Sequence, residues 1–497
     1  MNMQGKKIYQ EKLFAQIQLS ELVPQDNFYR RLKSILDLQW LYKATAKYYG
    51  KEGQISIDPT VFFKLILIGY LENQTSDRKI IGTVGMRLDM LYFIGYDIGE
   101  SLPWHSTLSR TRQLYGEEEF RLLFREVLKQ CIEKGMVAGC RQAVDSALIK
   151  ANASMESVVE KEILRDADAY ANSLEQEDNH GGSKTYRGKR VGRNETHCSS
   201  TDPDARLATK PGKPTQLNYL AQVSVDTASH VITNIEAHSA DKKDSECLAE
   251  VVANTISNLQ PQGLMVEEVL ADTGYSSGEA LQYLEDNNIN AYIPNLGQYK
   301  PEREGFTYDK ENDQYICSQG TKIVFKKIVY SSDGHYNKMY SSSRKDCGKC
   351  PLREQCIGAK SRYKNIYETT AKPLYDRMHK KMQGPKAKRM QKLRQTTAEP
   401  VIGTLINFLG MKRINTRGLH KATKCMIMAA IAYNLKKLLK FNQPQTQASV
   451  KQLKELTGLL QKRAKSGLIA SISCFNPYTI LWQREKQKFS SLILKIQ

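Results

Sequence analysis

Two short, mostly apolar runs that each carry an aspartate constrain the fold of this chain more than any other feature. Residues 142–149 read Gln-Ala-Val-Asp-Ser-Ala-Leu-Ile, and residues 266–271 read Val-Glu-Glu-Val-Leu-Ala directly before Asp272. Apolar runs of this length, bounded by turn-forming residues, are typical of buried strands. Asp145 therefore lies within one predicted strand, and Asp272 lies at the end of another.

A third acidic residue, Glu399, opens the apolar stretch 400–409 and follows a strongly basic run. Two aspartates on strands and a glutamate associated with a helix supply carboxylate oxygens, which are the ligands that Mg²⁺ prefers. Two such ions held together stabilise both the attacking and the leaving oxygen of an in-line phosphoryl displacement. The alternative is that these three residues belong to a solvated surface, as most of the 53 acidic residues do.

The sequence around the three acids resembles that of DDE transposases from bacterial insertion sequences. Residues 144–154 (Val-Asp-Ser-Ala-Leu-Ile-Lys-Ala-Asn-Ala-Ser) resemble the first-aspartate block, and residues 271–277 (Ala-Asp-Thr-Gly-Tyr-Ser-Ser) resemble the second. Residues 399–404 (Glu-Pro-Val-Ile-Gly-Thr), followed by Gly410–Arg413 and Arg417–Leu419, resemble the third. Three blocks in the expected order make the resemblance specific.

The resemblance covers residues 25 to 440, with one departure near the glutamate. Many relatives carry a Tyr-x-x-Arg-x-x-x-Glu-x6-Lys signature, but the positions four before and seven after Glu399 are Gln395 and Ile406. The nearest basic residues are Arg394 and Lys412. The closer branch of the family pairs its glutamate with a following proline, and this chain does the same.

The resemblance implies an enzyme that cleaves DNA at the terminal inverted repeats of an insertion sequence and joins the freed end to target DNA. Asp145, Asp272 and Glu399 would be its catalytic residues and would bind Mg²⁺ or Mn²⁺. Its partners would be double-stranded DNA, at both transposon end and target, and a second copy of the chain as a homodimer on DNA. If one of these three residues proves not to be catalytic, Asp226, Asp241 and Asp244 are the alternative candidates. Helix capping is nevertheless the expected role of Asp244.

The pattern of elements favours the fold that the family has, a ribonuclease-H-like α/β core. Residues 1–135 predict helices only, including one that Asp58 caps and Pro59 begins. Alternation then predicts strands, with helices between the later ones. The predicted strands are 141–149, 217–226, 231–237, 267–271 and 290–294, and the predicted helices are 241–259 and 278–286. In that fold the first and fourth strands are neighbours, which would bring Asp145 and Asp272 together.

These patterns divide the chain into a helical DNA-binding domain, a mixed-sheet core in two parts, an insertion and a tail. The predicted segments are 1–135 (helical domain), 136–298 (first part of the core, with a long insertion at 155–214), 299–365 (cysteine-rich insertion), 366–440 (second part, with the glutamate helix) and 441–497 (basic tail). We expect the 155–214 insertion to begin as a charged helix and to end as a loop. A loop of that length inside a domain is usually functional or disordered.

The charge of the chain predicts a polyanionic partner. The formal charge of +20 comes from 73 Lys+Arg against 53 Asp+Glu, and residues 360–394 carry much of the excess. Neutralising phosphates releases counterions and gives affinity that does not depend on sequence. The polar, charged start of the chain does not read as a signal peptide, and the apolar run 61–71 is too short to span a bilayer. We expect a bacterial cytoplasmic protein, nucleoid-associated when bound to DNA, with no membrane partner.

A helix predicted to start near Pro103, with Ser106 as its cap, is the candidate for reading DNA. Its Ser, Thr, Arg and Gln side chains can bond phosphates or base edges. The alternative is an ordinary amphipathic helix with a charged outer face. The predicted DNA-binding residues are Ser106, Thr107, Arg110 and Arg112 on this helix, and Lys388, Arg389, Arg394, Lys412, Arg413 and Arg417 in the carboxy-terminal part.

The insertion at 299–365 contains a set of cysteines with metal-ligand spacing. Cys317, Cys347, Cys350 and Cys356 are spaced C-x29-C-x2-C-x5-C, which fits a tetrahedral Zn²⁺ site. The alternative is four unrelated buried thiols, because a reducing compartment does not favour disulfides. We expect the insertion to have too few apolar residues for a core of its own, and we therefore expect one structural zinc to stabilise it.

Two other functions stay open alongside the transposase. One is a ribonuclease-H-like nuclease that cuts strands without joining them. The other is a non-catalytic DNA-binding protein, such as a domesticated transposase. The three acidic residues are all present, and loss of catalysis would give no reason to keep all of them.

Overall fold

The computed structural model describes residues 18–50, 52, 56–161, 193–209, 212, 214–297, 299–331, 336–357 and 361–441. The chain divides into two compact units. The first, the helical unit, contains the described residues within 18–136, 149–219 and 403–441; the second, the sheet unit, contains those within 137–148 and 220–402. The 155–214 insertion was expected to begin as a charged helix, but residues Met155–Ser157 form a short 3-10 turn and Val158–Glu160 form a strand. Residues 162–192, where the rest of that helix was expected, and the basic tail from residue 442 lie outside the described residues.

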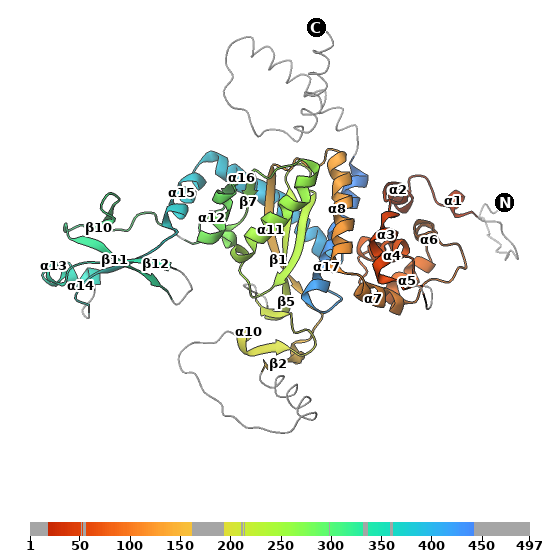
Figure 1. Cartoon of the computed structure of the whole chain (residues 1–497), viewed down its shortest axis with the longest axis horizontal. Helices are drawn as coiled ribbons and strands as arrows, with labels where there is room; N and C mark the ends of the chain where they lie inside the picture. Colours follow the sequence, from red (N-terminus) through yellow and green to blue (C-terminus); the bar gives the residue numbers. More distant parts are fainter. Residues whose placement is uncertain are drawn as a thin grey trace, which may run out of the picture. The chain divides into compact units, whose positions relative to one another are not determined.

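The described residues before 135 form helices and no strand, as predicted (Figure 1). Asp58 caps α4 by accepting hydrogen bonds from the backbone N–H groups of Thr60 and Val61, and Pro59 occupies the first helical position. The helices are α1 (Leu19–Leu22), α2 (Phe28–Ile35), α3 (Trp40–Thr45), α4 (Pro59–Leu71), α5 (Asp77–Gly85), α6 (Leu88–Ile94), α7 (His105–Leu114) and α8 (Glu117–Glu133). This part of the prediction is confirmed.

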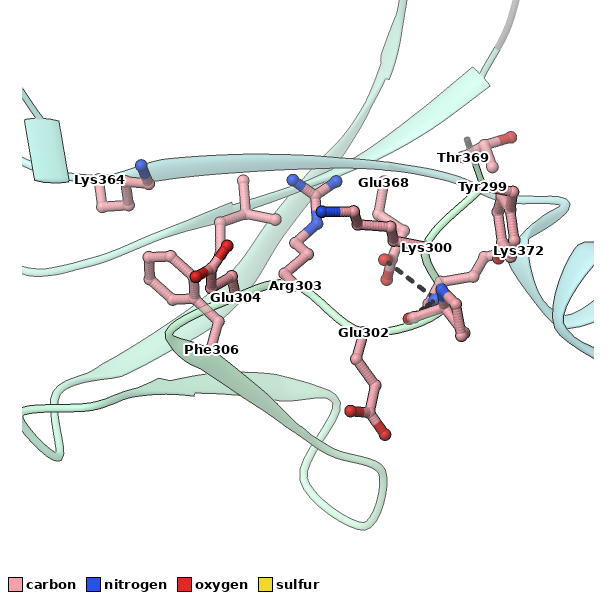
Figure 2. Close-up of a pocket in the computed structure, with 12 residues that line it drawn as sticks. Tyr299, Lys300, Glu302, Arg303, Glu304, Phe306, Lys364, Glu368, Thr369 and Lys372 are labelled. Atoms are coloured by element: carbon pink, nitrogen blue, oxygen red, sulfur yellow. Dashed lines mark hydrogen bonds and ion pairs between the residues drawn. The ribbon is translucent and has the colours of Figure 1, made fainter. Parts of the chain in front are cut away.

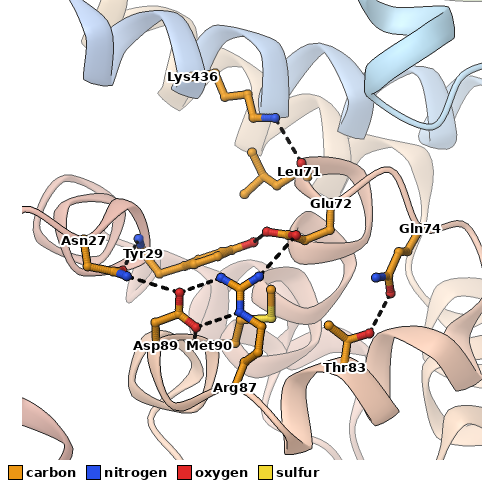
Figure 3. A network of polar contacts seen from close by, with 10 residues as sticks. All are labelled: Asn27, Tyr29, Leu71, Glu72, Gln74, Thr83, Arg87, Asp89, Met90 and Lys436. Carbon is orange, nitrogen blue, oxygen red and sulfur yellow. Dashed lines mark hydrogen bonds and ion pairs between the residues drawn. The ribbon is translucent and has the colours of Figure 1, made fainter. Parts of the chain in front are cut away.

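Charged side chains tie the ends of these helices together (Figure 3). The Arg87 guanidinium lies 2.6 Å from an oxygen of Asp89 and 3.3 Å from one of Glu72. The hydroxyl of Tyr29 donates a hydrogen bond to Glu72 over 2.5 Å. Helix α17 (Leu419–Lys440) joins this group, because the Lys436 ammonium donates to the backbone oxygen of Leu71. Within the helical unit α17 packs on α8, α4 and α2.

A mixed sheet forms the centre of the sheet unit, with β6, β5, β1, β7 and β8 side by side in that order. Strands β1 and β7 are parallel, with Ala143 opposite Leu270, so the predicted adjacency of these two strands is confirmed. The bounds are β1 (Arg141–Lys150), β5 (Gln216–Asp226), β6 (Ile232–Ser239), β7 (Glu268–Leu270) and β8 (Asn290–Tyr292). Strand β4 (Arg206–Ala208) pairs with the start of β5.

Helices α11 (Asp244–Leu259), α12 (Gly278–Asp286) and α15 (Lys372–Met382) cover the sheet and share one apolar core with it. Val144 of β1 and Val269 of β7 meet Val251 of α11 and Leu284 of α12 in this core. The order of a strand and a hairpin, then helix, strand, helix, strand and a late helix is the arrangement of a ribonuclease-H-like core. The predicted fold class is therefore confirmed.

Glu399 lies on a helix, as expected for the late helix that carries the glutamate. Helix α16 runs from Pro385 to Phe408, so Glu399 lies in its interior, directly before the apolar stretch 400–409. Pro400 also lies inside the helix. A proline removes one backbone hydrogen bond from a helix interior, yet this helix continues past Pro400.

The two insertions contain more structure than the sequence indicated. In the first, β2 (Val158–Glu160) pairs with β3 (His197–Ser199). In the second, five antiparallel strands follow the order β13-β12-β11-β10-β9. Their bounds are β9 (Phe306–Asp309), β10 (Gln314–Cys317), β11 (Lys322–Tyr330), β12 (Tyr336–Ser341) and β13 (Asn365–Thr369).

The second insertion has a small core of its own, so the expectation that it lacks one was wrong. Tyr315, Ile323, Tyr340 and Ile366 are all buried on one face of the five-stranded sheet. The rings of Tyr315 and Tyr340 meet edge to face, with centroids 5.1 Å apart. Two tyrosines and two isoleucines, one from each of four strands, supply this core, and a count of aliphatic residues misses the tyrosines.

Candidate active site

Asp145 lies near the middle of β1, next to the core residue Val144. Its side chain is largely buried, with 14% exposed, and its Oδ1 accepts a hydrogen bond of 2.8 Å from the backbone N–H of Ser146. The carboxylate is therefore held in place by its own strand. One of its two oxygens, Oδ2, is used by a partner from another element.

Asp272 follows β7, the strand beside β1. It caps the short helical turn η4 (Thr273–Tyr275), because its Oδ1 accepts a hydrogen bond of 2.9 Å from the N–H of Gly274. In the parallel register Ala143 faces Leu270; Asp145 comes two residues after Ala143 on β1, and Asp272 comes two residues after Leu270, in extended backbone just beyond β7. Side chains alternate with a period of two along a strand, so both aspartates leave the same face of the sheet.

Arg394 connects the first aspartate to Glu399. Its Nη1 donates to Oδ2 of Asp145 over 2.8 Å, and its Nη2 donates to Oε1 of Glu399 over 3.2 Å. The Arg394 side chain is 11% exposed and that of Glu399 is 56% exposed. The glutamate that sequence analysis selected is therefore tied to Asp145 through one guanidinium.

The electrostatics indicate that these carboxylates share one site. Burial raises the pKa of Asp145, and the charges of Asp272 and Glu399 raise it further, against the lowering effect of Arg394. Burial likewise raises the pKa of Asp272, with a contribution from Asp244. Opposing or like charges shift a pKa in this way only at close range. An acid-rich site with one resident cation is the result.

Asp244 is a fourth carboxylate at this site, beside Asp272. A Cβ on Gly274 would lie 3.1 Å from both Oδ2 of Asp244 and Oδ1 of Asp272. Asp244 is the first residue of α11, and the side chain of Gln222 donates a hydrogen bond of 2.8 Å to it. Glycine at position 274 thus leaves the space between the two carboxylates open.

Two uncharged residues that sequence analysis did not select complete this part of the site. The hydroxyl of Tyr275 donates to the side-chain oxygen of Gln222, and Tyr275 is fully buried. Burial raises the pKa of Tyr275, and the charges of Asp244, Asp145 and Asp272 add to it. The sequence signal that could have identified Tyr275 is its position in the Asp-Thr-Gly-Tyr block, three residues after Asp272.

The other two suggested replacements differ from Asp244. Asp226 is buried and accepts hydrogen bonds from the backbone N–H of Gly139, the N–H of Ala228 and the amide of Gln142. Those donors anchor the end of β5 and leave Asp226 a structural role. Asp241 lies in the exposed turn before α11.

The donor set at this site suits a hard divalent cation, because every candidate ligand is a carboxylate oxygen. Asp145, Asp272 and Glu399 come from two adjacent strands and one helix. In the described part of the chain, no three His, Cys, Asp or Glu side chains are grouped closely enough to hold an ion as they stand. The guanidinium of Arg394 lies between Asp145 and Glu399 and contacts both carboxylates, so these two carboxylates do not contact a common point.

The predicted DNA-binding residues on α7 divide into two groups. Helix α7 starts at His105, so the residue before it, Trp104, takes the cap position and Ser106 does not. Ser106 and Thr107 are half-buried in the first turn, and Arg110 is exposed. Arg112 is only 8% exposed.

Arg112 forms a two-pronged pair with Asp77, at 2.9 and 2.6 Å. Its guanidinium is committed to packing α7 against α5, and we remove it from the DNA-binding set. Among the carboxy-terminal residues, Lys388 and Arg389 are exposed on α16, and Lys412, Arg413 and Arg417 are exposed in the loop before α17. Arg394 is the exception, because it is buried.

A polar pocket of about 380 Å³ in the helical unit combines α7 with this loop. The Arg112–Asp77 pair lies in its wall, and Asn415 secures the loop by donating to the backbone oxygen of Thr75 over 2.8 Å. The full lining is Thr75, Asp77, Ser109, Arg112, Gln113, Asn152, Asn415, Thr416, Arg417 and Lys421. The lining has a net positive charge, because it contains one acid, Asp77, and three cations, Arg112, Arg417 and Lys421.

The four predicted zinc ligands meet in the insertion. Cys317, Cys347, Cys350 and Cys356 all line one small cavity of about 30 Å³. Each is half-buried, and all the described cysteines are free thiols. Lys364 and Arg353 line the same cavity. The thiols are neighbours, although they are not at ligand distances around a common point.

A second pocket of the insertion, of about 370 Å³, is open and lies beside the start of α15 (Figure 2). Three of its four cations, Arg303, Lys364 and Lys372, already have hydrogen-bond partners. Lys372 donates to the backbone oxygen of Pro301 over 2.6 Å and lies 3.2 Å from Asp376, and Arg303 donates to the backbone oxygen of Tyr367. None of the three predicted catalytic acids lines it.

Among the described residues, no helix is both long enough and apolar enough to cross a bilayer.

Two regions of the chain match models of transposase families. Residues 17–114 match the model described as Transposase domain (DUF772), and residues 316–439 match the model described as Transposase DDE domain. The second match contains Glu399, Arg394 and the cysteines. The resemblance to DDE-type transposases is thereby confirmed. No curated protein matched the chain.

Solved transposase structures show weak likeness to this chain. A piggyBac transposase synaptic complex with hairpin DNA is 10% identical, with a TM-score of 0.31 over 92% of this chain and 86% of that one. A Mos1 transposase paired-end complex with the left transposon end is 10% identical, with a TM-score of 0.16 over 51% of this chain and 65% of that one. TM-scores of this size do not establish a common arrangement, and the assignment depends on the two sequence matches.

Proposed function

We propose that this chain, a relative of DDE-type transposases, cleaves DNA strands at the terminal inverted repeats of an insertion sequence and transfers them to target DNA, with a divalent metal ion. The observation that supports this most is the ion-pair link from Asp145 through Arg394 to Glu399, beside Asp272. Three residues from distant parts of the sequence would not converge on one site by solvating a surface.

In this proposal Asp145, Asp272 and Glu399 hold Mg²⁺ or Mn²⁺. A metal held by these residues would activate water and would stabilise negative charge on the reacting phosphate. Asp145 is central, because it adjoins the strand that carries Asp272 and shares Arg394 with Glu399. Gly274 leaves the space beside Asp272 open, which favours the entry of a ligand there.

The two rival functions differ in what DNA products they give. A ribonuclease-H-like nuclease has the same acids but leaves cut ends unjoined. A non-catalytic DNA-binding protein gives no product at all. The acidic residues alone do not distinguish a nuclease from a transposase, because both need them. The presence of an acidic site does favour either enzyme over a non-catalytic DNA-binding protein.

A strand-transfer assay separates the three functions. Purified full-length chain is incubated with Mg²⁺, a plasmid target and labelled DNA that ends in the repeats flanking the gene. The proposal predicts labelled DNA joined to the plasmid, with 3′ ends covalently attached. Cleaved but unjoined DNA would support the nuclease, and bound but intact DNA would support the non-catalytic protein.

We also propose that DNA binds the helical unit at α7 and at the polar pocket, with the chain acting as a homodimer on DNA. Arg417 and Lys421 line that pocket, and no ion-pair partner is found for either among the described residues. A phosphodiester suits such a pocket because it is anionic and accepts hydrogen bonds. Ser106, Thr107 and Arg110 would face the DNA from α7, and the exposed cations Lys388, Arg389, Lys412 and Arg413 would add affinity.

Arg417→Gln tests the pocket. Affinity for transposon ends and for random DNA should fall together, and the slope of log affinity against log salt should decrease by about one. Arg110→Gln should instead reduce the preference for true ends. Lys134→Gln, on an exposed position after α8, is the matched charge control. An Arg417→Gln variant with unchanged affinity and salt slope would exclude the pocket.

We propose one structural Zn²⁺ at Cys317, Cys347, Cys350 and Cys356. Four thiols around one small cavity supply a closed set of soft ligands, and Lys364 and Arg353 would offset the charge of the thiolates. Because the five-stranded sheet has its own core, the metal would not support the whole insertion. It would fix α13 (Arg344–Gly348) and α14 (Arg353–Ile357) on the sheet.

Metal analysis of protein purified without added zinc tests this site. It should find about one equivalent per chain, and Cys350→Ser should lose it. Proteolysis of that variant should then occur first between residues 344 and 357. Cys131→Ser, a buried thiol of α8, serves as control and should keep the metal. Zinc-free wild-type protein with the same protease resistance would favour four ordinary thiols.

A further inference from the structure

Arg394 holds a position that a metal ion would need. Its guanidinium contacts Oδ2 of Asp145 and Oε1 of Glu399, two of the three proposed ligands. A guanidinium is a permanent cation with fixed, forked donors. The same two oxygens therefore already have a cation, supplied by the chain itself.

The geometry of this contact is unusual for an arginine that only stabilises a fold. A structural arginine commonly gives both prongs to one carboxylate, whereas Arg394 gives one prong to each of two. Those two carboxylates come from a strand and a helix. Asp145 lies 249 residues before Arg394 in sequence, whereas Glu399 lies 5 residues after it on the same helix. The contact therefore fixes the helix residue Glu399 toward the strand residue Asp145.

We propose that Arg394 is the internal counter-ion of the metal-free site, and that it gives up Asp145 and Glu399 when a divalent cation binds. This inference depends on the proposed metal function of the acids. Arg394 is a positioning residue: before metal arrives, it limits repulsion among Asp145, Asp272 and Glu399. When metal arrives, its positive charge opposes the metal, so it lowers the affinity of the site for divalent ions.

Exchange of the two cations has a structural consequence on α16. The guanidinium that leaves the carboxylates needs an anionic partner, since an unpaired buried charge is costly. A DNA phosphate is such a partner, because guanidinium binds phosphate through the same fork. Wild-type protein should therefore bind metal more tightly in the presence of DNA, and removal of Arg394 should weaken this coupling.

The test uses full-length, metal-free protein. Isothermal titration calorimetry measures its affinity for Mn²⁺, and thermal unfolding measures how much Mg²⁺ raises its melting temperature. Arg394→Gln should melt at a lower temperature than wild type without metal. It should bind Mn²⁺ on the order of tenfold more tightly, because one nearby positive charge is gone. Its rise in melting temperature with Mg²⁺ should also exceed that of wild type.

Two further variants keep the test decisive. Lys386→Gln removes another cation from α16, one that pairs with Glu268 over 2.8 Å, and should leave metal affinity unchanged. Arg394→Lys keeps the charge without the fork, and should remain folded with a metal affinity between wild type and Arg394→Gln. Equal metal affinity in wild type, Arg394→Gln and Arg394→Lys would overturn the inference.

Asp145→Asn separates the failure of this inference from failure of the metal site. If wild-type protein and Asp145→Asn bind the same amount of metal with the same affinity, the proposed metal function of the acids is wrong. If Asp145→Asn loses metal but Arg394 variants bind as wild type does, only the counter-ion role is wrong.

Discussion

Among the residues that the structure describes, two arginines are buried, one in each compact unit, and their arrangements are opposite. In the helical unit, Arg112 gives both prongs to a single acid, Asp77, at 2.9 and 2.6 Å. In the sheet unit, Arg394 divides its prongs between Asp145 and Glu399, with Asp272 nearby. Both arginines are about equally buried, at 8% and 9% exposure.

The difference between the two lies in the balance of charge. Arg112 and Asp77 neutralise each other, so the pair needs no further ion. Arg394 faces more negative charge than it can neutralise, and the pKa of Asp145 is raised as a result of burial and of Asp272 and Glu399. An excess of acid around one buried cation is a feature of sites that bind something else. Burial of an arginine therefore does not identify its role, whereas the number of acids that share it does.

The largest expected effect is loss of the balanced pair. Arg112→Gln leaves Asp77 without its cation in a mostly buried position, and breaking a buried pair in this way costs about 3–5 kcal/mol. Urea unfolding of the full chain measures it. Added Mg²⁺ should recover none of this loss, whereas it should recover the loss in Arg394→Gln. Equal recovery by Mg²⁺ in the two variants would remove the distinction between the two arginines.

A smaller effect is expected from a third buried pair, which can titrate. Burial alone lowers the pKa of His238, but contacts with Cys247 and Glu236 raise it overall from 6.5 to about 9. His238 lies 3.4 Å from Glu236, and Glu250 lies 3.8 Å from its other ring nitrogen. A raised histidine pKa contributes stability that is complete below pH 6.5 and is lost as pH rises through about 9.

Thermal unfolding of wild type and His238→Gln across this range measures the contribution. The difference in melting temperature between them should be largest near pH 6.5 and should shrink toward pH 9. The ability of Mg²⁺ to stabilise the protein should be the same in both. A constant difference over the whole range would show that His238 does not gain a proton on folding.

Local pattern was sufficient to predict the elements that carry the acids. The strand of Asp145 and the position of Asp272 after its strand followed from short apolar runs, and parallel pairing of β1 with β7 agreed with the expected fold. Helix α12 (Gly278–Asp286) has the predicted bounds. Such features depend on neighbours in sequence, which is the information that a single chain provides.

Features that depend on distant contacts were not predictable. Arg394 was assigned to DNA because it belongs to a basic run, and only the folded chain brings Asp145 to it. Asp244 was expected to act as a cap, whereas its proximity to Asp272 depends on α11 packing next to η4. The core of the insertion was missed because its two tyrosines and two isoleucines come from four strands and meet only after those strands pair.

The central claim is that Asp145, Asp272 and Glu399 form one metal-dependent site for cutting DNA. The most direct test is cleavage of DNA ending in the flanking repeats, in Mg²⁺, by full-length Asp145→Asn, Asp272→Asn and Glu399→Gln. Each change removes a negative charge with little change of shape, and Asp286→Asn on α12 is the control. The account predicts cleavage at background level in all three, with DNA binding and control activity retained. Cleavage near the wild-type rate by any of the three would contradict it.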